Sequence, residues 1–173
     1  MNWFKEQLEY IRDLDKDVVD YIDKYTNYSS RMINDSLRGR RSYISNLDKK
    51  LDEVIAKSPP ALKSYTVFRL TRTVDYINQD GFVSKGYLST TIDSEDLVRR
   101  WQEIKRHNNI YTILRITVPE GVQGLYVEGK NEYEILFRHN ITLKLIKPQR
   151  ELEYLTKKSE FVKIPTIDLL ILQ

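Results

Sequence analysis

The chain has 173 residues, a length typical of one domain that buries its own core. Hydrophobic residues make up 40% and charged residues 31%, which excludes a disordered chain, and a net charge of +3 is too small for a nucleic-acid-binding protein. The lack of cysteine excludes disulfides, a zinc ribbon and a thiol nucleophile, and the two histidines match no metal spacing. With no secretory signal and no apolar run near the roughly 20 residues of a membrane span, we expect a protein that acts in a cytoplasm.

The first sixty residues predict helices. Apolar side chains recur at helical spacing in three groups, Phe4–Ile22, Tyr28–Leu37 and Leu47–Ile55. Gly39 supplies a stop after the second group, and Pro59 with its neighbouring proline ends the third. We therefore expect a helical N-terminal layer over residues 1–60.

From Tyr65 onward the pattern changes to strands. Short aromatic and β-branched runs alternate with glycine, proline and asparagine, and Asp93 or Ser94 caps one inserted helix that carries Leu97 and Trp101 on one face. Predicted strands cover Tyr65–Leu70, Tyr87–Thr91, Tyr111–Val118, Gly124–Val127, Tyr133–Arg138, Ile141–Ile146 and Ile167–Leu172. The charged segment 147–159 is expected to be a loop or a helical excursion.

These elements predict an α+β fold in one domain. The helical layer would pack on a largely antiparallel sheet core over residues 64–173, and the chain shows no internal repeat or linker.

Three short segments carry side chains suited to chemistry. Arg69 lies in an apolar strand; alone it is most simply an exposed strand arginine, but a guanidinium also offers a planar set of donors for a phosphate. Ser89-Thr90-Thr91 follows Gly86 and is either an ordinary β-branched strand or a set of hydroxyls that position other groups.

The third segment is Glu132-Tyr133-Glu134. Carboxylates two residues apart in a strand share one face, where their repulsion gives a structural role little gain, although a solvated strand face remains the simplest explanation. The apolar run Ile135–Phe137 that follows places the pair at the entry to a buried strand.

A fourth segment, Ile33-Asn34-Asp35-Ser36-Leu37-Arg38-Gly39, precedes the first strand. Asn34 and Arg38 lie one helical turn apart, so both can face one cleft, although an ordinary amphipathic helix end gives the same pattern.

In this order, the four segments resemble the arginine-serine-glutamate class of mono-ADP-ribosyltransferases, which includes bacterial toxins and phage enzymes. The resemblance covers roughly residues 25–146 and implies N-terminal helices on two antiparallel β-sheets with a NAD cleft between them. NAD would be the co-substrate, with no metal, and the segment Thr73–Lys85 would border the nicotinamide and phosphates.

The resemblance also implies the role of each site residue. Arg69 would hold a NAD phosphate, assisted by Asn34 and Arg38, and Ser89 would orient Glu134. Glu134 would hydrogen-bond the nicotinamide ribose and stabilise the positive charge that develops as the glycosidic bond breaks.

Three further positions complete the implied site. Thr90 and Thr91 would shape the nicotinamide pocket, and Leu70 is counted with the NAD-binding positions although glycine is common there in the family. Glu132 would align and deprotonate the incoming nucleophile. Glutamate at this position accompanies arginine modification in the family, so we predict arginine as the acceptor.

One departure from the family concerns the target. Several toxins carry an aromatic residue three positions before the first acid, where this chain has Gly129. The target of those toxins therefore does not transfer to this chain, and Tyr126 or Tyr133 would supply contact with the target instead. Arg72 competes with Arg69 for the phosphate role.

Three other functions stay open at this stage. The enzyme could hydrolyse NAD with water as a NAD glycohydrolase, or the domain could be a catalytically inactive binding module. A nucleic-acid-binding module has only mild basicity and 12 tyrosines in its favour. We expect a monomer that acts on NAD and a target protein, without nucleic acid or membrane, as an effector or as a phage enzyme in the cytoplasm of the producer or of an invaded host cell.

Overall fold

A computed structural model describes residues 3–26, 34, 46–107, 111–129 and 132–172 of the chain. The helices are Trp3–Arg12 (α1), Lys16–Lys24 (α2), Asn46–Lys57 (α4) and Ser94–Lys105 (α5). The strands are Tyr65–Thr71 (β1), Phe82–Ser84 (β2), Leu88–Thr91 (β3), Thr112–Val118 (β4), Leu125–Gly129 (β5), Glu132–Phe137 (β6), Ile141–Leu155 (β7) and Phe161–Ile171 (β8).

The helices form where apolar spacing predicts them. The first predicted group makes two helices, α1 and α2, and the third makes α4. The second group lies outside the described residues except for Asn34. The predicted cap of α5 is Asp93, whose carboxylate accepts the backbone N–H of Glu95 and Asp96 at 3.0 Å each.

The strands form an eight-stranded sheet in the order β2-β7-β8-β4-β1-β3-β6-β5, so the α+β prediction is confirmed. All neighbours are antiparallel except β4 and β8. The two halves of the sheet meet at β1 and β3, which pair only at Phe68 and Thr91, whereas β1 pairs with β4 along all of Tyr65–Thr71. The two predicted sheets are therefore two halves of one sheet, joined at one register position.

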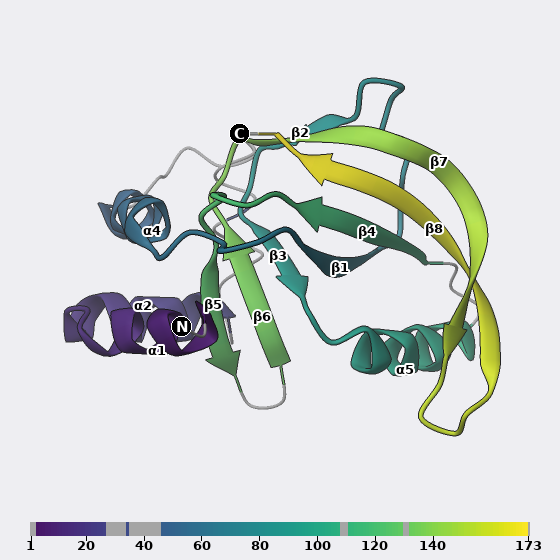
Figure 1. Cartoon of the computed structure of the whole chain (residues 1–173), viewed down its shortest axis with the longest axis horizontal. Coiled ribbons are helices and arrows are strands. Elements are labelled where there is room, and N and C mark those ends of the chain that lie inside the picture. The colour runs from purple at the N-terminus through teal and green to yellow at the C-terminus, as the bar shows by residue number, and fades with distance from the viewer. Residues whose placement is uncertain (1–2, 27–33, 35–45, 108–110, 130–131, 173) are drawn as a thin grey trace.

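Most of the segment 147–159 is not the loop or helix that its charge suggests, because β7 continues to Leu155 and only residues 156–159 form a turn. It belongs to a long hairpin of β7 and β8, which curves past α5 (Figure 1). The prediction was wrong because the strand has one exposed face whose charged residues interrupt the apolar pattern, and because its ladder shifts register around Pro148. β2, three residues long, was also missed.

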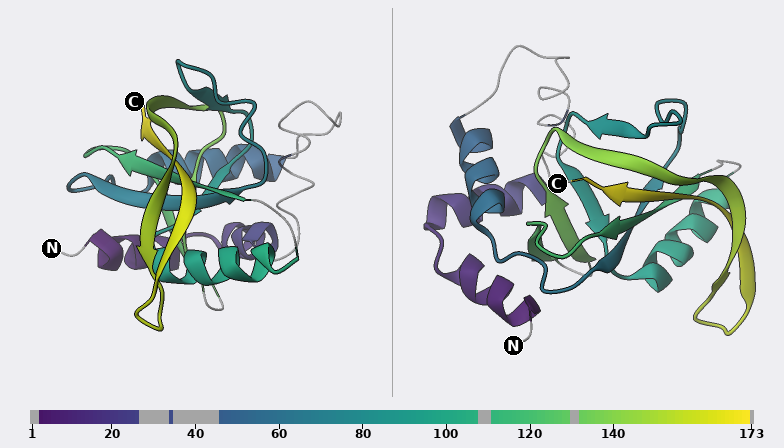
Figure 2. Two further views of the ribbon diagram at one scale, coloured as in Figure 1. Left: turned by 90° about the vertical axis from the view of Figure 1, so that its right-hand side faces the viewer. Right: turned by 45° about the horizontal axis from the view of Figure 1, so that its top comes forward.

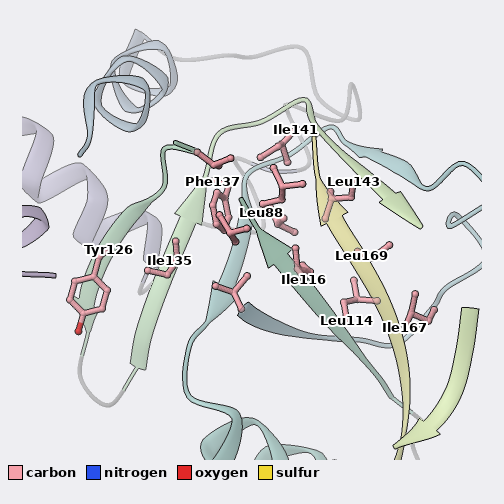
Figure 3. Packing of buried hydrophobic residues seen from close by; sticks show 14 of the residues in the cluster. Leu88, Leu114, Ile116, Tyr126, Ile135, Phe137, Ile141, Leu143, Ile167 and Leu169 are labelled. Carbon is pink, nitrogen blue, oxygen red and sulfur yellow. The ribbon is translucent and has the colours of Figure 1, made fainter. Parts of the chain in front are cut away.

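Three apolar clusters join helices and sheet. The largest collects side chains of β1 and of β3 to β8, and Figure 3 shows them gathered between the strands; among them are Leu88, Ile116, Ile135, Phe137, Leu143 and Leu169. A second cluster packs α2 and α4 against β5 and β6, and a third packs α5 against β1, β4 and β8. The half of the sheet with β3, β6 and β5 thus lies between the main core and the N-terminal helices (Figure 2).

Gln7 of α1 is fully buried and hydrogen-bonds the edge strand β5. Its Nε2 donates to the carbonyl of Gly124 at 2.9 Å and to that of Pro59 at 2.8 Å, and its Oε1 accepts the N–H of Tyr126 at 3.1 Å. The side-chain amide therefore satisfies backbone groups that the sheet leaves without a neighbouring strand.

We expect Gln7→Met to lower the free energy of unfolding by about 1–3 kcal/mol, because the buried N–H of Tyr126 loses its acceptor, whereas the carbonyls of Pro59 and Gly124 keep bonds from Trp3 and Ser58. Urea denaturation measures the change. Lys5→Met, on the exposed side of the same helix, is the control and should change stability by less than about 0.5 kcal/mol. Equal losses in the two variants would contradict a hydrogen-bonding role for Gln7.

Candidate active site

A pocket of about 270 Å³ opens where β1 and β3 diverge. Because the two strands pair at one position only, ladder hydrogen bonds do not close the space beside it. Its lining comes from β1, β3, β6 and the first turns of α5: Phe68, Arg69, Leu70, Ser89, Thr90, Thr91, Asp96, Leu97, Arg100 and Glu134.

Arg69 connects the two halves of the sheet across this opening. Its Nη1 donates to the backbone carbonyl of Ser89 at 2.7 Å, and the side chain is half-buried. A charge-assisted bond of this kind takes the place of a ladder bond and fixes the guanidinium at the pocket.

Glu134 brings a carboxylate to the same pocket from β6. Only 8% of the residue is exposed, and its backbone pairs with Thr91 on one side and Val127 on the other. Thr90 strengthens the contact between β3 and β6, because its hydroxyl donates to the carbonyl of Ile135 at 2.8 Å. A carboxylate held between two paired strands has little freedom to move, which suits the stabilisation of a developing charge.

The first turns of α5 add charged groups that the sequence analysis did not identify. Asp96 accepts hydrogen bonds from Arg99 and, at 2.6 Å, from Nε of Arg100. Burial raises the pKa of Asp96, but the two arginines outweigh it and hold the pKa below its ordinary value. Arg100 and Asp96 thus line the pocket as an ion pair, and only the spacing of the two arginines after Asp96 signals it in the sequence.

A second hollow, of about 470 Å³, also reaches Arg69. Much of its wall comes from the segment after β1, which was expected to border NAD: Thr73, Tyr76, Phe82, Val83, Ser84 and Lys85. Tyr76 packs edge-on against Phe82 with ring centroids 4.9 Å apart. Arg69 therefore lies between two hollows, one beside Glu134 and one beside this segment.

The structure brings six of the predicted residues together at one pocket: Arg69, Leu70, Ser89, Thr90, Thr91 and Glu134. Their roles toward NAD stay predictions.

The other predicted site residues lie elsewhere or are described only in part. Asn34 is buried under the start of β3, and Arg38 lies outside the described residues. Glu132 begins β6 and pairs with Gly129. Of the two predicted target contacts, Tyr133 is 49% exposed, whereas Tyr126 is buried and packs against Phe4 in α1.

Comparison with known proteins identifies the family. The family described as ADP-ribosyltransferase exoenzyme matches residues 75–169, more than half of the chain. The chain belongs to this family. It is accordingly a transferase that acts on NAD. No curated protein matches it in sequence.

Solved structures agree with this family in fold. C3larvin toxin, an ADP-ribosyltransferase from Paenibacillus larvae, superposes with a TM-score of 0.68 at 18% identity, covering 98% of this chain and 94% of the toxin. Plx2a, another ADP-ribosyltransferase toxin from Paenibacillus larvae, gives 0.71 at 17% identity, covering 98% and 92%. The ADP-ribosylating toxin BECa of a binary enterotoxin from C. perfringens, solved with NADH, gives 0.66 at 17% identity, covering 97% of this chain but 46% of BECa.

Two features of the described part of the chain concern metals and membranes. Its residues include no group of three or more histidine, aspartate or glutamate side chains that could hold a metal ion. None of its helices has the length and apolar character needed to cross a membrane.

Proposed function

We propose that this chain transfers ADP-ribose from NAD to arginine side chains of target proteins. The observation that carries the proposal is the meeting of Arg69, Ser89 and Glu134 at one pocket, where the two halves of the sheet diverge. This pocket combines a cation, hydroxyls and a buried carboxylate. These groups fit the phosphates, the ribose and the developing positive charge of NAD.

In the proposed reaction, the bond between nicotinamide and C1′ of its ribose breaks, and nicotinamide leaves with the bonding electrons. The sugar then carries positive charge as in glycoside cleavage, and the carboxylate of Glu134 on β6 stabilises that charge. Arg69 binds a NAD phosphate, and Ser89 orients Glu134.

The acceptor is proposed from Glu132, two residues before Glu134 on β6. A guanidinium is almost fully protonated at neutral pH, so it must lose a proton as its nitrogen bonds to C1′. A carboxylate at Glu132 would attract the guanidinium and receive that proton. The 49% exposure of Tyr133, between the two glutamates, supports it as a contact for the target protein.

The test of the function is incubation of the chain with labelled NAD and agmatine, a small arginine mimic. ADP-ribosyl-agmatine is the expected product. Free ADP-ribose without the adduct would show a NAD glycohydrolase or another acceptor, and no NAD consumption would favour a binding module.

Glu132→Ala is expected to abolish transfer to agmatine while NAD hydrolysis falls by no more than about threefold, because water needs no deprotonation by Glu132. Both products are measured from the same labelled NAD. Glu128→Ala, at an exposed residue of the neighbouring strand, is the control and should leave both rates unchanged. Parallel loss of transfer and hydrolysis would contradict the role given to Glu132.

A further inference from the structure

The start of β3 has an unusual source of hydrogen bonding. Tyr87 is 1% exposed, so its backbone N–H needs a protein acceptor. β1 pairs with β3 only at Thr91, at the other end of the strand. The acceptor is instead the side chain of Asn34, whose Oδ1 lies 2.7 Å from the Tyr87 nitrogen.

Asn34 is itself held from its other end. Its Nδ2 donates to the hydroxyl of Tyr25 at 2.9 Å, and both residues are buried. The ring of Tyr25, at the C-terminal end of α2, packs edge-on against the ring of Tyr87 with centroids 5.4 Å apart. Tyr25 and Asn34, nine residues apart in the N-terminal region, therefore both contact the residue just before β3.

Gly86 provides the space for this contact. A Cβ built on Gly86 would lie 2.5 Å from Oδ1 and 3.0 Å from Cγ of Asn34. The φ of Gly86 is not in the left-handed region, so any residue could adopt its backbone conformation. Glycine is required here because a larger residue would push the Asn34 amide away from Tyr87.

The hydrogen bond between Asn34 and Tyr87 lies two residues along the chain from the pocket. Ser89 follows Tyr87 by two positions, and its carbonyl is the acceptor for Arg69. A displacement at Tyr87 therefore moves Ser89 and changes its position relative to Arg69 and Glu134.

We propose that Asn34 is a positioning residue for ADP-ribosyl transfer. Tyr25 holds its side chain, and Gly86 leaves the space that the side chain occupies. Through its hydrogen bond to the Tyr87 N–H, Asn34 determines the position of Ser89. The inference rests on the proposed function for its effect on catalysis. In this proposal Asn34 acts by holding β3 in position and does not contact NAD directly.

The first test separates kcat from NAD affinity. Asn34→Ala is expected to lower kcat for NAD cleavage by about 10- to 100-fold, because small misplacements of reacting groups are costly. The Kd for NAD, measured by titration, should change by less than about threefold. A rise in Kd of about tenfold with an unchanged kcat would overturn the proposal, since it would show direct contact with NAD.

Two conservative variants test the hydrogen bonds individually. Asn34→Asp keeps an acceptor for Tyr87, and the Tyr25 hydroxyl can turn to donate to it, so most of kcat should return. Tyr25→Phe removes only the hydroxyl and should give a smaller loss than Asn34→Ala. If Asn34→Asp is as impaired as Asn34→Ala while thermal melts show both folded, the proposal fails.

The second test is a double-mutant cycle. Gly86→Ala should reduce kcat in the native background but add less than about twofold to Asn34→Ala, because the atoms it displaces are already gone. If kcat of the double variant falls by the product of the two single reductions, the link between Gly86 and Asn34 is overturned.

The third test does not depend on activity. Amide hydrogen exchange by NMR should show protection at Tyr87 that is lost in Asn34→Ala and in Gly86→Ala, with chemical-shift changes at Ser89 in both. Unchanged Tyr87 protection or an unchanged Ser89 signal would overturn the proposal. Failure of the native chain to consume NAD would overturn the proposed function alone, leaving this measurement to decide the positioning role.

Discussion

Replacement of Glu134 with alanine is expected to lower the rate of NAD cleavage by about 10²-fold or more, the scale for loss of one preorganised electrostatic group. The residue is 8% exposed and its strand is paired with β3 and β5, so its carboxylate is held in place beside the pocket. Transfer to agmatine should fall by the same factor, because both products require the same bond to break.

The measurement is release of labelled nicotinamide, with circular dichroism to verify that each variant is folded. Glu134→Gln preserves the shape and should be nearly as impaired, because it lacks the negative charge. Glu128→Ala, exposed on β5, should stay within about twofold of the native rate. A folded Glu134→Ala variant with more than a tenth of native activity would refute the assignment.

Asp168→Asn should reduce the free energy of unfolding by about 2–4 kcal/mol. Asp168 on β8 accepts hydrogen bonds from Arg115 of β4 at 2.8 and 2.9 Å and from Arg150 of β7 at 2.6 Å. The aspartate side chain is 10% exposed, but those of Arg115 and Arg150 are 40% and 31% exposed. Water therefore compensates part of the loss, so we expect the lower half of that range.

The contribution of Asp168 to the free energy of unfolding depends on pH, and the direction follows from its pKa. Burial raises the pKa of Asp168, but the hydrogen bonds from Arg115 and Arg150 outweigh it and hold the pKa below its ordinary value. The pair therefore contributes fully above the unfolded pKa near 3.9 and loses its contribution as the pH falls through the lower folded pKa. Urea denaturation of the native chain and of Asp168→Asn should show the same difference in the free energy of unfolding at pH 7 and at pH 5. The control Asp75→Asn, at an exposed residue, should differ from the native chain by almost nothing. A difference that disappears between pH 7 and pH 5 would contradict the assignment.

The strands that carry the predicted site residues could be predicted from the sequence because their signals are local. Arg69, Ser89 and Glu134 each lie in a short run of strand-forming residues, and spacing alone placed them on β1, β3 and β6. Their meeting at one pocket depends on strand order, which a single sequence does not encode, and it was predicted by resemblance to a family.

What the sequence could not reveal depends on contacts between distant segments. Asp168 pairs with arginines 53 and 18 residues away, and the Asn34 amide reaches Tyr87 across 53 residues. The strand pattern of β7 was hidden because the alternation of Leu152 and Tyr154 with glutamates is short and follows the polar run 147–151, which shows no alternation.

The bonds from Gln7 to Gly124 and Tyr126 also bear on the edge of the sheet at β5. An edge strand presents unpaired N–H and C=O groups that another molecule can use as a template. The side-chain amide of Gln7 occupies one of those groups on β5, the N–H of Tyr126, and also the carbonyl of Gly124 just before the strand. We therefore expect a chain shortened by its first twelve residues to keep every pocket residue but to expose backbone groups at β5 with which a strand of a second molecule can pair.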